Sequence, residues 1–190
     1  MYNLVMEKMK LLLHSCCGPC STSVIEKLKD DYDLTIFYYN PNIYPEEEYL
    51  KRFETQKEYL IKSNQNIPVI DGTYNDNPLF EQSFAGLENC PEGGERCAKC
   101  LMLRIKKTAE YAKNNGFDLF TTTLSVSPHK NATLINGLGK RFSQYYHIDF
   151  LESDFKKKDG FLISTKLSKE YNLYRQKYCG CKYSLLNNPQ

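Results

Sequence analysis

Eight cysteines, gathered into short groups, constrain the fold of this 190-residue chain more than any other feature of its sequence. Cys90 stands apart, and the others form one group of three and two groups of two: Cys16, Cys17 and Cys20, then Cys97 and Cys100, then Cys179 and Cys181. Adjacent cysteines such as Cys16 and Cys17 rarely form a disulfide with each other. In a chain long enough to bury a full core, such groups indicate metal ligands or catalytic thiols more than a disulfide framework.

The composition argues against a membrane protein. No window reaches the roughly 18 uninterrupted apolar residues of a membrane span. The first ten residues carry charges and lack the long apolar region and cleavage site of a signal peptide. The formal net charge of +2 is too small to indicate a nucleic-acid partner by itself. We therefore expect a cytoplasmic chain, without membrane contact, that folds as one domain over residues 1–190.

Short apolar runs alternate with amphipathic segments along the chain. The runs typical of strands are residues 10–15, 34–39, 67–70, 119–124 and 145–151. Apolar spacing predicts a helix after residue 20, further helices over residues 46–63, 77–88, 95–115, 132–139 and 162–173, and an irregular tail around residues 179–181. This alternation predicts an α/β fold, a Rossmann-like parallel sheet of about five strands flanked by helices.

Two of the predicted helices carry local signals. In helix 46–63, Leu50, Phe53 and Leu60 are expected to face inward. Helix 95–115 is expected to end at Gly116, because glycine readily adopts the left-handed conformation that follows many helices.

The first and fourth predicted strands lead to the same edge of the sheet. The first ends directly in the first cysteine group, and the fourth ends in the polar loop 125–131. In parallel sheets, ligand sites form beyond the carboxyl ends of the strands, where the strand order reverses. His129 and Lys130 lie in that loop, where they can contact an anionic substrate. His14, just before the cysteines, is a candidate hydrogen-bond donor beside the site, although a satisfied core histidine is the commoner role.

The first cysteine group lies in a strand-to-helix turn. Backbone N–H groups and the helix dipole lower the pKa of thiols there and favour thiolate, the form that binds metal or attacks a substrate. Cys17-Gly-Pro-Cys20 alone is the active-site tetrapeptide of thioredoxins, so a thioredoxin-like dithiol reductase using Cys17 and Cys20 is one alternative. Cys16 and the five remaining cysteines have no place in that mechanism.

The later cysteine groups extend the case for metal. Cys97 and Cys100 share one helical turn, which brings two sulfurs close enough to hold zinc or an edge of an iron–sulfur cluster. Arg96 and Arg104 can offset the negative charge of thiolates bound to a cluster. A zinc-stabilised nucleic-acid-binding module is the second alternative, but groups of three, two and two suit one cluster with four ligands plus an adjacent metal with three.

Four segments occur together in a recognisable order: residues 14–21 (HSCCGPCS), 92–100 (EGGERCAKC), 120–131 (FTTTLSVSPHKN) and 173–181 (LYRQKYCGC). They resemble the cobalamin-independent epoxyqueuosine reductases, the H-type enzymes of the queuosine pathway. The resemblance implies an oxidoreductase that removes the epoxide oxygen of epoxyqueuosine at the wobble position of tRNA, leaving queuosine and water. It also implies a HUP-like domain of the nucleotide α-hydrolase type, whose usual phosphate loop has become the first cysteine group.

The same resemblance implies a [4Fe–4S] cluster and an additional iron ion. Carried onto this chain, the ligands of the cluster are Cys16, Cys17, Cys97 and Cys100. The ligands of the second metal are Cys20, Cys179 and Cys181, although some relatives have Asp at the position of Cys20. No role follows for Cys90.

Substrate, electrons and protons complete the expectations. The implied partner is a tRNA anticodon stem-loop carrying epoxyqueuosine, together with an unidentified electron donor. Deoxygenation also consumes protons, and the candidate donors near the cysteines are Tyr178, His129 and His14.

Overall fold

Five parallel strands form the single sheet of this protein, whose computed structural model describes residues 7–187. Their order across the sheet is β3-β2-β1-β4-β5. Their bounds are Lys10–His14 (β1), Asp33–Tyr38 (β2), Val69–Asp71 (β3), Leu119–Thr122 (β4) and Asp149–Phe150 (β5). The α/β fold with a parallel sheet of five strands is thereby confirmed, with the strand order of a Rossmann domain.

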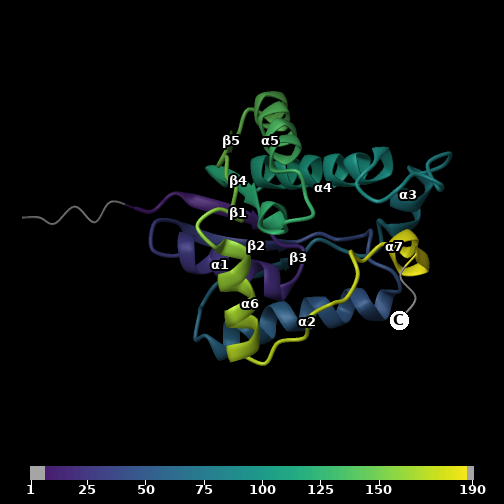
Figure 1. The fold of residues 1–190 in the computed structure, drawn as a ribbon. Helices are drawn as coiled ribbons and strands as arrows, with labels where there is room; N and C mark the ends of the chain where they lie inside the picture. The colour runs from purple at the N-terminus through teal and green to yellow at the C-terminus, as the bar shows by residue number, and fades with distance from the viewer. Residues whose placement is uncertain (1–6, 188–190) are drawn as a thin grey trace, which may run out of the picture.

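Helices cover both faces of this sheet (Figure 1). On one face lie α1 (Gly18–Leu28), α2 (Glu46–Lys62) and α6 (Gly160–Glu170), and on the other lie α4 (Glu95–Asn114) and α5 (Ala132–Tyr146). Two short helices, α3 (Asn77–Gln82) and α7 (Lys182–Asn187), lie beyond the carboxyl ends of the strands. No helix within residues 7–187 is long and apolar enough to cross a membrane.

The central strand β1 is apolar on both sides because helices cover both sides. Leu11 and Leu13 pack into one core cluster with residues of α1 and α2, and Leu12 packs into a second cluster with residues of α4 and α5. All three side chains are fully buried. A near-continuous apolar run is what a strand in such a sheet requires.

The strand order reverses between β1 and β4, and the last residues of these strands pair directly. His14 lies opposite Thr122 in the parallel register. β1 then runs into the first cysteine group, and β4 runs into a 3-10 helix over Thr123–Val126. The predicted meeting of these two segments at one edge of the sheet is therefore confirmed.

Four predicted elements are wrong in extent. The helix predicted over residues 77–88 ends at Gln82. The fourth strand stops at Thr122, because Thr123 begins the 3-10 helix. The fifth strand holds only Asp149–Phe150, because α5 continues through residues 145 and 146. The helix predicted to end at Gly139 continues to Tyr146. A side chain at Gly139 would overlap the Phe150 ring, so the glycine there lets α5 pack closely on β5.

Of the other local predictions, some are confirmed and one is wrong. Leu50 was expected to face inward but is 49% exposed, whereas Phe53 and Leu60 are buried as predicted. Helix α4 ends before Gly116, which has a φ of +71°, and Phe117 N–H donates to the Ala112 carbonyl in the hydrogen bond that closes such an end. Residues 179–181 have irregular backbone as predicted, and α7 follows directly after them.

Candidate metal centre

The first cysteine group is a compact cluster of three thiols at the carboxyl end of β1. The sulfur atoms of Cys16, Cys17 and Cys20 all lie within 4.8 Å of one another, and those of Cys16 and Cys17 are 3.9 Å apart. Cys17 caps the start of α1 and is fully buried, while Cys16 and Cys20 are partly buried. This geometry can bind a metal.

Close packing of α1 against α2 fixes this turn. A Cβ atom on Gly18 would lie 2.7 Å from the Thr55 carbonyl oxygen, so the turn cannot hold a larger residue without moving one helix. Pro19 suits the first helical turn, where its missing N–H costs nothing. Glycine and proline therefore serve local geometry here, whatever chemistry the cysteines perform.

The three thiols share their protons unequally. Hydrogen bonds from Cys17 and Cys20 hold the pKa of Cys16 well below its usual range, with a further contribution from the positive charge of Arg104. The same hydrogen bonds raise the pKa values of Cys17 and Cys20, and burial raises them further. Three thiolates this close repel one another, so all three can ionise together only beside a cation.

The segment after β4 completes one side of the cluster. Thr123 Oγ1 lies 3.5 Å from Cys16 Sγ and accepts a hydrogen bond of 3.3 Å from the Cys16 backbone N–H. The pairing of β1 with β4 thus places a hydroxyl against the first sulfur. The strand predicted over residues 119–124 includes Thr123, whose contact with Cys16 follows from the strand order.

Cys97 and Cys100 lie on the first turns of α4. The Gly93 N–H donates to Cys97 Sγ over 3.3 Å, and Gly93 has a φ of +85°, which favours glycine. Burial raises the pKa of the Cys100 thiol, and the negative charge of Cys179 raises it too. The second cysteine group is therefore within electrostatic reach of the third.

The third group reaches the site on a segment of irregular backbone, residues 171–181, which we call the strap. It follows α6 and runs along α2 to α7 (Figure 1). The Gln176 side-chain amide donates to Cys17 Sγ over 3.1 Å, joining the strap to the first cysteine group. Burial raises the pKa of Cys181 to about 11, and the charges of Cys179, Cys100 and Cys97 add to the shift.

Two cations, the half-buried Lys130 and the buried Arg104, lie among the cysteines. Lys130 Nζ is 3.6 Å from Cys179 Sγ, and the negative charge of Cys179 raises the pKa of this lysine. Arg104 is 3% exposed, donates to Asn40 Oδ1 over 2.5 Å, and favours the thiolate form of Cys16 and Cys100. Within residues 7–187 neither cation forms an ion pair with a carboxylate. Their charges therefore face the thiolates.

Arg96 and Cys90 serve the loop before α4 instead. Arg96 Nη1 donates to the carbonyls of Leu87, Glu88 and Cys90, and its guanidinium lies 4.3 Å from the centre of the Tyr183 ring in α7. The Cys90 sulfur is not one of the three that lie within 4.8 Å of one another. Of the two arginines expected to offset cluster charge, Arg104 alone faces the cysteines through its charge.

The three candidate proton donors occupy different environments. His14 is fully buried: its Nε2 lies 3.0 Å from the Tyr39 carbonyl and its Nδ1 lies 2.8 Å from Thr122 Oγ1. Burial lowers the pKa of His14 to about 3, so the ring is neutral. Tyr178 is buried and donates its hydroxyl to the Tyr44 carbonyl, whereas His129 is exposed beside Lys130.

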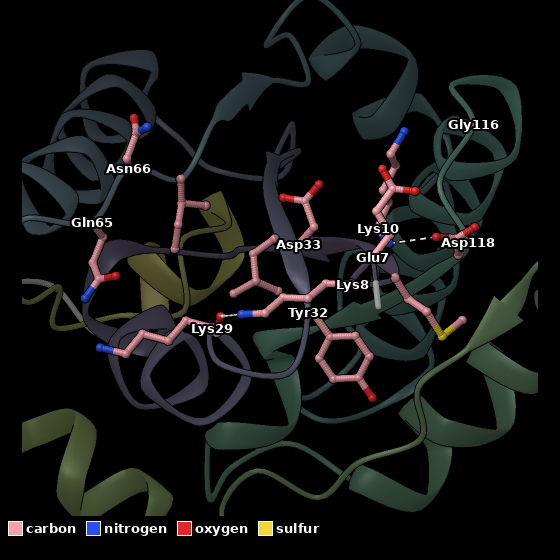
Figure 2. A pocket seen from close by; sticks show the side chains of 13 residues that line it. Glu7, Lys8, Lys10, Lys29, Tyr32, Asp33, Gln65, Asn66, Gly116 and Asp118 are labelled. Carbon is pink, nitrogen blue, oxygen red and sulfur yellow. Dashed lines mark hydrogen bonds between the residues drawn. The ribbon is translucent and has the colours of Figure 1, made fainter. Parts of the chain in front are cut away.

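A separate hollow of about 740 Å³ lies at the opposite edge of the sheet (Figure 2). Its lining includes Lys8, Lys29, Asp33 and Asp118, so positive and negative charges are mixed. Lys8 already donates to the Lys29 carbonyl, and Asp118 accepts from the Lys10 N–H. The hollow lies at the amino end of β1, whereas Cys16, Cys17 and Cys20 follow its carboxyl end. The length of the strand therefore separates the hollow from these cysteines.

Comparison with known proteins decides the family. A family model described as "Epoxyqueuosine reductase QueH" matches residues 11–187. The chain belongs to the QueH family. Among similar QueH proteins, that of Acinetobacter baylyi is 43% identical over 93% of this chain and 80% of its own length. The Staphylococcus epidermidis protein is 38% identical over 95% of this chain and 78% of its own length.

A more distant QueH protein matches over a similar extent. The Thermotoga maritima relative is 34% identical over 93% of this chain and 90% of its own length. The resemblance to epoxyqueuosine reductases inferred from the four cysteine-rich and threonine-rich segments is thereby confirmed. The sequence of this QueH chain predicts no role for Arg52, Thr123 or Gln176, which contact the cysteine segments. Thr123 and Gln176 lie in two of the four recognised segments, but nothing in those segments marks them as partners of the cysteines.

Proposed function

We propose that this chain reduces epoxyqueuosine in tRNA to queuosine at one iron–sulfur site built from its three cysteine groups. The cluster ligands are Cys16, Cys17, Cys97 and Cys100. The second iron takes Cys20, Cys179 and Cys181. The proposal is supported by the electrostatic interactions that link these groups, by the nearby Arg104 and Lys130, neither of which pairs with a carboxylate within residues 7–187, and by membership of the QueH family.

The donor set fits such a metal site. Soft thiolates are the usual ligands of iron–sulfur clusters, and hydrogen bonds to their sulfurs tune the cluster. Five of the grouped cysteines accept a hydrogen bond at sulfur: Cys16, Cys17, Cys97, Cys179 and Cys181. Arg104 and Lys130 balance negative charge that would otherwise be costly to bury.

Cys20 belongs to the compact first group, although it is proposed as a ligand of the second iron. Its sulfur lies as near to Cys16 and Cys17 as a shared site requires, within 4.8 Å. The same thiol is proposed as a ligand of the second iron with Cys179 and Cys181. A ligand in this position would hold the second iron directly beside the cluster.

When bound, the cluster supplies electrons and the second iron supplies a Lewis acid for the epoxide oxygen. The overall reaction adds two electrons and two protons to epoxyqueuosine and releases queuosine and water. The chain's own part is to hold the grouped thiols in place and to favour the thiolate form of Cys16. Thr123 holds Cys16, Gln176 holds Cys17, and Lys130 holds Cys179.

Protons reach the oxygen from a group that the substrate can touch. His129 is exposed on the loop after β4, next to Lys130, and we propose it as the first candidate. Tyr178 is the second, although its hydroxyl already donates to the Tyr44 carbonyl. His14 has the least support, because both ring nitrogens are bonded and burial lowers its pKa to about 3.

The proposal is tested with protein purified and reconstituted without oxygen. Incubation with a chemical reductant and tRNA containing epoxyqueuosine should convert that nucleoside to queuosine, measured by mass spectrometry of digested tRNA. Omission of the reductant should abolish conversion. Binding of the tRNA should weaken as salt rises, because phosphate contacts release counterions. A protein that carries the cluster and binds the tRNA but yields no queuosine contradicts the proposal.

A thioredoxin-like dithiol reductase is the alternative that the geometry tests most directly. That mechanism needs a reactive thiolate at the first cysteine of the pair. Cys17 is fully buried here, and hydrogen bonding to Cys16 raises its pKa. Iron-free protein that reduces disulfides would favour this alternative, and stoichiometric zinc without sulfide would favour the nucleic-acid-binding module.

A further inference from the structure

Arg52 is an arginine inside the protein on a helix that contributes no cysteine. It lies in the middle of α2, is 2% exposed, and falls on the helix face that also buries Tyr49, Phe53 and Gln56. A buried guanidinium is costly unless its donors are all used. What Arg52 contacts therefore indicates why α2 carries it.

The donors of Arg52 divide between α2 and the strap. Nε donates to Glu48 Oε1 over 2.7 Å, one turn earlier on the helix. Nη1 donates to the Cys179 carbonyl over 3.1 Å, and Nη2 donates to the Tyr178 carbonyl over 3.3 Å. The guanidinium also lies 5.0 Å from the centre of the Tyr178 ring. A planar fork with several donors suits this set of partners, and a lysine could not reproduce it.

Glu48 contacts an earlier part of the strap. Its carboxylate accepts the Tyr174 hydroxyl at 3.1 and 3.0 Å while it pairs with Arg52. The two α2 side chains therefore hold the strap at Tyr174, Tyr178 and Cys179. Because the strap has no helix or strand of its own, these contacts replace a backbone ladder.

The turn between the last two cysteines is pressed against Arg52. Gly180 has a φ of +123°, and a Cβ atom there would lie 2.9 Å from Arg52 Nη1 and 3.2 Å from Ile43 Cγ1. The Gly180 carbonyl accepts the Tyr44 N–H over 2.8 Å. Arg52 and the loop before α2 therefore fix the position of the turn that carries Cys179 and Cys181.

We infer that Arg52 is a positioning residue that seats the Cys179-Gly180-Cys181 turn, so that these two cysteines can bind the second metal. The inference rests on the proposed function for the identity of that metal. The seating itself rests only on the contacts of Arg52, Glu48 and Gly180. It assigns to α2 a part in the site that the cysteine pattern does not reveal.

The first test needs no metal. In iron-free Arg52→Lys and Arg52→Met proteins, alkylation of Cys179 and Cys181 by iodoacetamide should be faster by about tenfold, because hydrogen bonds to a charged group no longer hold the turn closed. Alkylation of Cys16, which Arg52 does not contact, should stay at the parent rate. Lys57→Met is the matched control, since Lys57 lies on α2 and pairs with Glu54 away from the strap.

The second test uses reconstituted protein. The Arg52 variants should lose about one iron per chain while sulfide stays at the parent level. Should they unfold, Gly180→Ala displaces the same turn from the other side and should give both results. If the Arg52→Lys protein kept the alkylation rates and the iron content of the parent protein, the inference would be overturned. Reconstituted parent protein without sulfide would overturn the proposed function instead, and the alkylation rates would still decide the role of Arg52.

Discussion

The first cysteine group and the strap differ in what holds them. Residues 16–20 continue directly from β1 into α1, so strand pairing, helix formation and core packing all fix Cys16, Cys17 and Cys20. The strap has irregular backbone and is held by side chains of another helix, chiefly Arg52 and Glu48. One half of the site is therefore part of the fold, and the other is attached to it.

This difference has an energetic consequence. Displacing the first group requires opening the sheet edge or moving α1, which costs much of the free energy of unfolding. Displacing the strap breaks a few hydrogen bonds, each with a net contribution of about 0.5–1.5 kcal/mol or somewhat more where a charge takes part. We therefore expect the metal held by the strap to leave first and to depend most on single side chains.

Loss of a cluster ligand should have the largest effect. Cys97→Ser should abolish both the visible absorbance of the cluster and queuosine formation, because serine oxygen is a poor substitute for a thiolate on iron. Cys90→Ser is the matched control on the loop just before α4 and should retain both properties. Full turnover by the Cys97→Ser protein would refute the ligand assignment.

A change at Gly18 should show that the first group belongs to the fold. Gly18→Ala places a Cβ atom 2.7 Å from the Thr55 carbonyl and should lower the free energy of unfolding by about 1–3 kcal/mol, as overpacking does. Gly137→Ala, on the open surface of α5, should instead stabilise the protein by about 0.5–1 kcal/mol. Denaturant unfolding of both variants provides the measurement.

The corresponding change in the strap should act locally. Gly180→Ala meets Arg52 and an unfavourable backbone angle, yet it should lower the free energy of unfolding less than Gly18→Ala does, because the strap can detach while the core stays folded. Equal losses of stability at the two glycines would show that the strap is as integral to the fold as the first turn.

Removal of the Lys130 charge should weaken the binding of the second metal. Lys130→Met takes an ammonium away from Cys179 Sγ, 3.6 Å distant, and should speed the release of one iron to a chelator by about tenfold. Lys130→Arg keeps the charge and should stay closer to the parent rate. Identical release from all three proteins would show that the cysteines alone set the affinity.

The contact between the two regions should have the smallest effect. Gln176→Leu removes the hydrogen bond to Cys17 Sγ and should shift the reduction potential of the cluster to a more negative value, with the free energy of unfolding nearly unchanged. Lys177→Met, at the exposed neighbouring position, is the control. Potentiometric titration followed by absorbance distinguishes the two variants, and equal potentials would mean that Gln176 only packs.

The same contrast explains how far the sequence could be read. Strand β1 and the turn after it were predicted because an apolar run followed by Cys-Cys-Gly-Pro-Cys is a local signal. The fifth strand was overextended, since the aromatic residues 145 and 146 suit a strand or an amphipathic helix end equally well. Local patterns identify an element more securely than its ends.

Long-range partners were beyond such patterns. Arg52 has the appearance of an ordinary charge on a highly charged helix, and only the packed structure places it under Tyr178 and Cys179. Thr123 and Gln176 likewise reach Cys16 and Cys17 across more than a hundred residues of sequence. The cysteines could be recognised by type, whereas the residues that place them could be found only by position.

Metal and sulfide content measured on one anaerobically reconstituted sample tests the central claim most directly. Thiolates from three distant segments that share one cluster and an adjacent ion should give about five iron and about four acid-labile sulfide per chain. Zinc without sulfide, or iron bound without sulfide, would contradict a cluster held by these cysteines.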